Sequence, residues 1–102
     1  MKNQLRAIHP GEILKEDYLV PLQMSVNALA KALHVTPSRI NDIVLGRRGI
    51  TPDTALRLAR YFGGDAQSWL NLQQAYDLKV AEKSILKNIL KTVTPLNTAS
   101  AC

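Results

Sequence analysis

Apolar residues along this chain recur at the three- and four-residue spacing of an amphipathic α-helix. One stripe that follows the i, i+3, i+4, i+7 spacing consists of Ala55, Leu58, Ala59 and Phe62. The sequence contains no alternating run of four or more β-branched residues and no Asn-Gly hairpin turn. The pattern therefore predicts an all-α fold with short connections.

Helix start and stop signals divide this pattern into five predicted helices. Two stops coincide with Gly46 and Gly63, and the first helix is expected to stop before Pro21, because proline disrupts a helix interior. The residues expected to cap or open the helices are His9 with Pro10, Ser25, Thr36, Thr51 and Asp65. The predicted helices span about residues 10–19, 26–33, 37–45, 52–62 and 66–93.

The last predicted helix is apolar on two sides. Its first stripe consists of Trp69, Leu72, Tyr76 and Val80. Its second stripe, rotated from the first, consists of Leu78, Ala81, Ile85 and Ile89. A helix that is apolar on two sides needs two neighbours, of which the domain core supplies one and a second subunit is the natural other. We expect core or dimer anchors at Trp69, Leu72, Tyr76 and Leu78.

Length and composition fit a single globular domain. The chain has 102 residues, of which 46% are hydrophobic and 21% charged. We expect a domain over residues 1–94 and a flexible tail over 95–102. The start shows no leader pattern and no apolar run is long enough for a membrane span, so we expect a cytoplasmic protein. Its one cysteine, Cys102, excludes an intramolecular disulfide and a multi-cysteine zinc site.

The formal net charge of +5 suits an anionic partner such as nucleic acid. Helices 26–33 and 37–45 also match a helix-turn-helix. Ala30 is small where the two helices would cross, and His34 occupies the turn position that usually holds glycine, where positive φ is needed. The apolar residues expected between the helices are Leu29, Leu33, Val35, Ile40 and Ile43.

The second helix of this motif presents polar side chains that can reach base edges. Arg39 suits guanine or a phosphate, and Asn41 suits adenine. Asp42 either accepts from cytosine or orients Arg39, and Ser38 lies on the same outward side. For Asp42, a solvated surface position is an equal alternative.

Phosphate contacts have two expected sources. Ser25 and Asn27 lie at the N-terminus of helix 26–33, where free N–H groups and the helix dipole favour an anion. Arg47 and Arg48 follow the reading helix and are placed for the flanking backbone; a solvated loop is the alternative reading.

The chain resembles HigA-type antitoxins of the Xre-like helix-turn-helix class. The resemblance rests on HPGEIL at 9–14, NALAKALHVTPSRINDIVLGRRGIT at 27–51, ALRLARYFG at 55–63 and SWLNLQQAYDL at 68–78. It implies a five-helix, lambda-repressor-like domain with an extended C-terminal helix. It further implies base reading by Thr36, Ser38, Arg39, Asn41 and Asp42. The departures from the family are His34 at the usual glycine and the basic extension after Glu82.

By this resemblance, the chain would neutralise a HigB-type, RelE-like mRNA interferase toxin and repress its own operon as a homodimer on operator DNA. The main alternative is a phage-type repressor without a toxin partner, and another is an interaction module that has lost DNA binding. Without a catalytic constellation or phosphate loop, we expect no enzyme activity, no cofactor and no metal.

Two further features allow two interpretations each. The HPGEIL motif is explained either by local helix capping or by a partner contact. A cationic stripe recurs every fourth residue, and it is either a solvated face or a contact with DNA or an acidic partner. It consists of Lys79, Lys83, Lys87 and Lys91.

Overall fold

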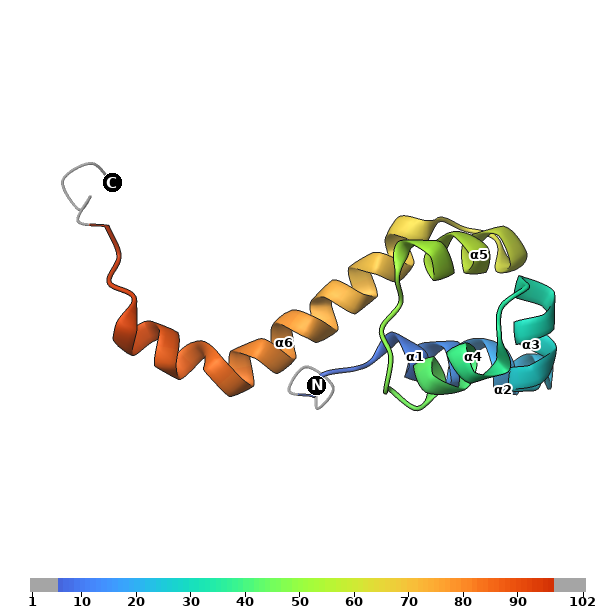
Figure 1. The fold of residues 1–102 in the computed structure, drawn as a ribbon, viewed down its shortest axis with the longest axis horizontal. Coiled ribbons are helices and arrows are strands. Elements are labelled where there is room, and N and C mark those ends of the chain that lie inside the picture. The colour runs from blue at the N-terminus through green and yellow to red at the C-terminus, as the bar shows by residue number, and fades with distance from the viewer. Residues whose placement is uncertain (1–5, 97–102) are drawn as a thin grey trace.

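The structure, a computed structural model, describes residues 6–96, and every regular element in that range is helical (Figure 1). The elements are α1 (Pro10–Ile13), the π-helix η2 (Leu14–Leu19), α2 (Val20–Leu22), α3 (Val26–Leu33), α4 (Pro37–Val44), α5 (Pro52–Phe62) and α6 (Ala66–Thr92). Because α1, η2 and α2 follow without a break, they form one helix in space. The predicted all-α fold with five helices is confirmed.

The first helix runs through Pro21, so the predicted stop before this residue is wrong. In η2 the backbone widens, and the N–H of Val20 donates to the carbonyl oxygen of Lys15, five residues earlier. A proline ring normally clashes with the carbonyl four residues before it, and the wider turn moves that carbonyl aside. The helix ends instead at Gln23, which has a φ of 53°.

The predicted capping residues all cap the N-termini of their helices. The side-chain oxygens of Ser25, Thr36, Thr51 and Asp65 each accept the backbone N–H three residues later. His9 caps α1 through Nδ1, which accepts the N–H of Gly11 at 2.8 Å. Each cap satisfies a backbone donor that has no partner within the helix, which explains the close agreement between predicted and observed helix starts.

One core joins the helices. Its fully buried large side chains include Leu14, Leu29, Ile40, Ile43 and Leu58, contributed by η2, α3, α4 and α5. α6 closes the core with Trp69, whose ring lies 5.4 Å from that of Tyr18 between centroids. The chain thus needs only the first turns of α6 to complete the domain.

The rest of α6 leaves the domain as an isolated rod (Figure 1). The molecule measures 57 × 26 × 25 Å, and its radius of gyration of 17.6 Å exceeds the roughly 13 Å of a compact chain of this length. α6 is continuous and bends in its second half, where the Ser84 hydroxyl donates to the carbonyls of Val80 and Ala81. Apolar side chains exposed on this part are Leu78, Val80, Ile85, Leu86, Ile89 and Leu90.

Candidate nucleic-acid interface

Helices α3 and α4 pack against each other as the predicted helix-turn-helix. His34 ends α3 in the left-handed conformation, with φ 60° and ψ 45°, as expected for the turn. The N–H of Val35 then donates to the carbonyl of Ala30, and Ala30 is completely buried. The substitution of histidine for glycine is therefore accommodated without changing the motif.

The N-terminal end of α4 carries most of the predicted base-reading residues. Thr36 caps the helix, and its hydroxyl also lies 3.2 Å from the Ser38 hydroxyl. Ser38 and Asn41 are exposed, while Ile40 and Ile43 on the opposite side are fully buried. A polar edge with a buried apolar back is the arrangement that a helix needs to enter a groove.

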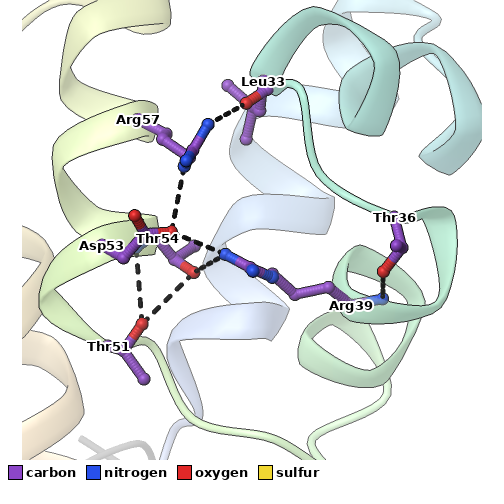
Figure 2. A network of polar contacts seen from close by, with 7 residues as sticks. All are labelled: Leu33, Thr36, Arg39, Thr51, Asp53, Thr54 and Arg57. Atoms are coloured by element: carbon purple, nitrogen blue, oxygen red, sulfur yellow. Dashed lines mark hydrogen bonds and ion pairs between the residues drawn. The ribbon is translucent and has the colours of Figure 1, made fainter.

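Arg39 lies on the flank of α4 and reaches across to α5, which the sequence did not predict (Figure 2). Its Nη1 donates to Asp53 Oδ2 at 2.7 Å and to Thr54 Oγ1 at 3.4 Å. Arg57 donates to the same Asp53 oxygen at 2.9 Å through Nε. Hydrogen bonds from Arg57 and then Arg39 lower the pKa of the Asp53 carboxyl below its ordinary value, as expected for a carboxylate that accepts from two guanidinium groups.

Asp42 pairs with the arginines of the following loop and not with Arg39. Its carboxylate lies 3.0 Å from Arg47 Nη2 and 3.6 Å from Arg48 Nη2. Its carbonyl oxygen also accepts the backbone N–H groups of both arginines. The loop is therefore tied to the end of α4, and two cations stand beside this helix and share one carboxylate.

The remaining phosphate candidates lie at the start of α3. Ser25 caps this helix by accepting the N–H of Ala28 at 3.0 Å, and Asn27 stands in the first turn. Both side chains are exposed. Ser25 and Asn27 therefore belong to the first helix of the helix-turn-helix, which packs against α4.

The predicted anchors on α6 separate into two groups. Trp69 is buried in the core, and Leu72 is half-buried against it. Tyr76 is half-buried and packs edge-on against His9, with ring centroids 4.8 Å apart. Leu78, in contrast, has 62% of its surface exposed and contributes nothing to the core.

The HPGEIL motif has a local structural explanation. His9 caps α1, Pro10 occupies its first position, and Glu12 forms an ion pair with Arg6 at 3.0 Å. Gly11 lies where α1 crosses α4, and a Cβ at this position would overlap the backbone oxygen of Ile43. The close crossing accounts for the glycine, and the capping reading accounts for His9 and Pro10.

Sequence reasoning missed Gln73, which holds the loop before α5. Its Oε1 accepts the backbone N–H of Ile50 at 2.8 Å, and its Nε2 donates to Asp77. Gln73 also packs against Gly49, where a Cβ would stand about 3.0 Å from the amide. α6 thus fixes the position of the loop that carries Arg47 and Arg48.

Within residues 6–96, no three His, Cys, Asp or Glu side chains gather where they could hold a metal ion. Over the same residues, none of the helices has the length and apolarity of a membrane span. Cys102 lies outside the described residues.

Comparisons with known proteins agree with this geometry. The helix-turn-helix family matches residues 15–69. Virulence-associated protein I of Dichelobacter nodosus is 66% identical over 97 residues, which cover 95% of this chain and 88% of that protein. An addiction module antidote protein of the HigA family from Coxiella burnetii is similar with a TM-score of 0.85 and 53% identity, over 89% of this chain and 99% of that one. The Pseudomonas aeruginosa antitoxin HigA, solved with the higBA promoter, gives a TM-score of 0.87 at 47% identity, again over 89% and 99%.

Proposed function

Because the chain belongs to the helix-turn-helix family that includes the HigA-type antitoxins, we propose that it is a sequence-specific DNA-binding antitoxin that represses its own operon. The observation that carries this proposal is helix α4, which is polar and exposed at its N-terminal end and is followed at its C-terminal end by Arg47 and Arg48. A protruding polar helix flanked by cations can read bases while its surroundings hold phosphates. The likeness to an antitoxin solved with its promoter supports the same role.

In this proposal, α4 enters the major groove with its N-terminal end. Thr36, Ser38, Arg39 and Asn41 face base edges, and Asp42 orients the loop arginines. Phosphates on either side are held by Arg47 and Arg48 and by the N-terminus of α3 at Ser25 and Asn27.

The active form is a homodimer joined through the second half of α6. Ile85 is 50% exposed and Ile89 is 40% exposed, and these two residues lie one turn apart on the second apolar stripe of α6. Burying such a stripe against a second copy is favourable at about 25 cal/mol per Å² of apolar surface. The dimer then presents two copies of α4 to successive major grooves, about 34–36 Å apart, on a pseudo-palindromic operator.

The antitoxin role adds a protein partner, a HigB-type mRNA interferase of the RelE-like class. The support for it is the likeness to an addiction module antidote protein over nearly the whole length of both chains. The sharp test is co-expression: the product of the adjacent gene should arrest growth alone, and this chain should restore growth and co-purify with it. An adjacent gene product that is harmless would favour a repressor without a toxin partner.

DNA binding is tested by fluorescence anisotropy on DNA from upstream of the protein's own gene, with a scrambled duplex as control. We expect specific binding at least about a thousandfold tighter than scrambled binding, with a steep dependence on salt. Equal weak binding to both duplexes would contradict autorepression and leave a partner-binding module.

A further inference from the structure

Two arginines from different helices converge on a single carboxylate oxygen beside the reading helix (Figure 2). Arg39 Nη1 on α4 lies 2.7 Å from Asp53 Oδ2, and Arg57 Nε on α5 lies 2.9 Å from the same atom. Arg57 also donates through Nη1 to the carbonyl of Leu33 at 2.9 Å, so its position is fixed by the end of α3. Asp53 would therefore keep one firmly placed arginine if Arg39 were to leave.

The pair stands in an open hollow. A cavity of about 310 Å³ is lined by Arg39, Arg48, Asp53 and Arg57, together with Gly49, Thr51 and Thr54. The side chain of Asp53 is 54% exposed and that of Arg39 is 31% exposed, so the ion pair is accessible from solvent. Arg48 is also paired with Asp42, but Arg39, Arg47, Arg48 and Arg57 together outnumber the two carboxylates Asp42 and Asp53, so this side of α4 stays positive. A positive surface suits the sugar–phosphate backbone that would run beside α4.

The carboxylate therefore faces the same anionic surface that the arginines attract. An ionised aspartate beside DNA repels phosphates, and it also occupies the one guanidinium on α4 that could reach a guanine. Its place in the first turn of α5 is favourable to the helix dipole, but the helix is already capped by the hydroxyl of Thr51. Helix capping by itself does not explain why an acid stands opposite Arg39.

Resting on the proposed DNA binding, we propose that Asp53 is a specificity-determining residue that competes with DNA for the guanidinium of Arg39. On the operator, a bidentate contact with guanine replaces the ion pair, and Arg57 continues to neutralise Asp53. On other sequences no guanine contact compensates Arg39 for the loss of its ion pair. Arg39 therefore stays bound to Asp53 and does not contact a phosphate. Asp53 thereby weakens binding to other sequences more than binding to the operator. Specificity then arises because the Asp53 carboxylate competes with DNA for Arg39.

The test compares wild type with Asp53→Asn on the upstream duplex and on the scrambled duplex, at several salt concentrations. In the variant, scrambled binding should tighten roughly three- to tenfold, and its salt slope should steepen by about one unit because Arg39 meets a phosphate. Operator affinity should change less, so the discrimination ratio should fall. Asp53→Glu, which keeps the charge, should retain a ratio closer to that of wild type.

Two controls separate competition from a general charge effect. Asp17→Asn makes the same change of charge on η2, away from Arg39, and should leave the ratio unchanged. In an Arg39→Ala background, Asp53→Asn should no longer lower the ratio, since the guanidinium for which it competes is absent. Thermal unfolding by circular dichroism confirms that each variant is folded, and Asp53→Ser replaces the asparagine variant if the latter melts below the assay temperature.

Several outcomes would overturn the inference. If Asp53→Asn weakens binding to both duplexes by the same factor, Asp53 only holds Arg39 in place. If it strengthens both by the same factor, Asp53 acts only through general repulsion of DNA. The same conclusion follows if Asp17→Asn lowers the ratio equally, or if the effect persists without Arg39. A wild-type protein that does not distinguish the two duplexes would instead refute the proposed DNA function itself.

Discussion

Gly11 on α1 crosses α4 so closely that the backbone oxygen of Ile43 fills the space in which a side-chain carbon would stand. We predict that Gly11→Ala lowers the free energy of unfolding by at least about 2 kcal/mol, because two buried backbones must separate. Urea denaturation followed by circular dichroism measures this loss. Gly64→Ala is the matched control: its Cβ would meet nothing within 4 Å, so only the strain of a φ of +84° remains, which costs about 1 kcal/mol. Equal losses in the two variants would contradict the close crossing.

His9 makes the stability of the fold depend on pH. Burial lowers the pKa of its imidazole below the ordinary value, against an opposing effect of Asp77, and the neutral Nδ1 accepts the N–H of Gly11. Protons therefore bind the unfolded chain more readily than the folded one. This contribution to stability is complete above the ordinary histidine pKa of about 6.5 and is lost as the pH falls through the lowered value.

Unfolding midpoints in urea at about pH 7.5 and about pH 5.5, which bracket the ordinary histidine pKa, measure the effect. We expect wild type to be less stable at the lower pH. His9→Asn, which can still cap α1, should reduce this difference. An identical pH dependence in both proteins would show that His9 does not carry the effect.

Asn41 is exposed on α4, and we propose that its amide reads adenine. We expect Asn41→Ala to weaken operator binding by about 1–3 kcal/mol and to relax the preference at one base pair, because one bidentate contact is lost. Anisotropy against a set of single-base operator variants measures both quantities. Asn71→Ala on α6, where the side chain accepts from Gln67, controls for loss of an amide elsewhere. Loss of affinity that is uniform over all variants would remove Asn41 from the base-reading set.

Arg47 and Arg48 should supply two phosphate contacts. Replacing both with alanine is expected to flatten the slope of log affinity against log salt by about two units, on operator and scrambled DNA alike. The comparison is Lys83→Ala with Lys87→Ala, which removes the same charge from the second half of α6. If the lysine variant flattens the slope and the arginine variant does not, DNA contacts the cationic stripe of α6 and not the loop.

A substitution at Ile85 on α6 tests the proposed dimer interface. Half of its surface is exposed in the single chain, and Ile85→Glu would place a charge inside the proposed interface. We expect sedimentation to show a monomer at concentrations where wild type is a dimer, while the melting of the domain core persists. Lys87→Glu introduces the same side chain on the lysine side of α6 and should leave the dimer intact. A wild-type chain that sediments as a monomer at all concentrations would exclude this interface.

The sequence is informative where the deciding interactions are local. Ser25, Thr36, Thr51 and Asp65 each bind an N–H three residues away, and so the helix starts were predictable from neighbours in the chain. The stop at Pro21 was wrong because a π turn removes the steric clash on which the rule depends.

The candidate site was less predictable because its partners come from different helices. The Asp53 and Arg57 pair has the i, i+4 spacing of a helix ion pair, a local signal that our sequence analysis did not use. The Arg39 contact with Asp53 depends on how α4 lies against α5, which no local pattern encodes. Asp42 was expected to orient Arg39, to accept from a base or to be solvated. It instead forms ion pairs with Arg47 and Arg48, which follow it closely in the chain.

The isolated rod of α6 also has a consequence for the spacing of operator sequences. In the proposed dimer, the part of α6 between Tyr76 and Ile85 sets the rotation of one copy of α4 relative to the other. One residue inserted there would rotate the domain by about 100° and shift it by about 1.5 Å, without changing α4 or the apolar residues from Ile85 onward. The length of α6 would therefore determine the spacing between half-sites, while α4 alone would determine which bases are read.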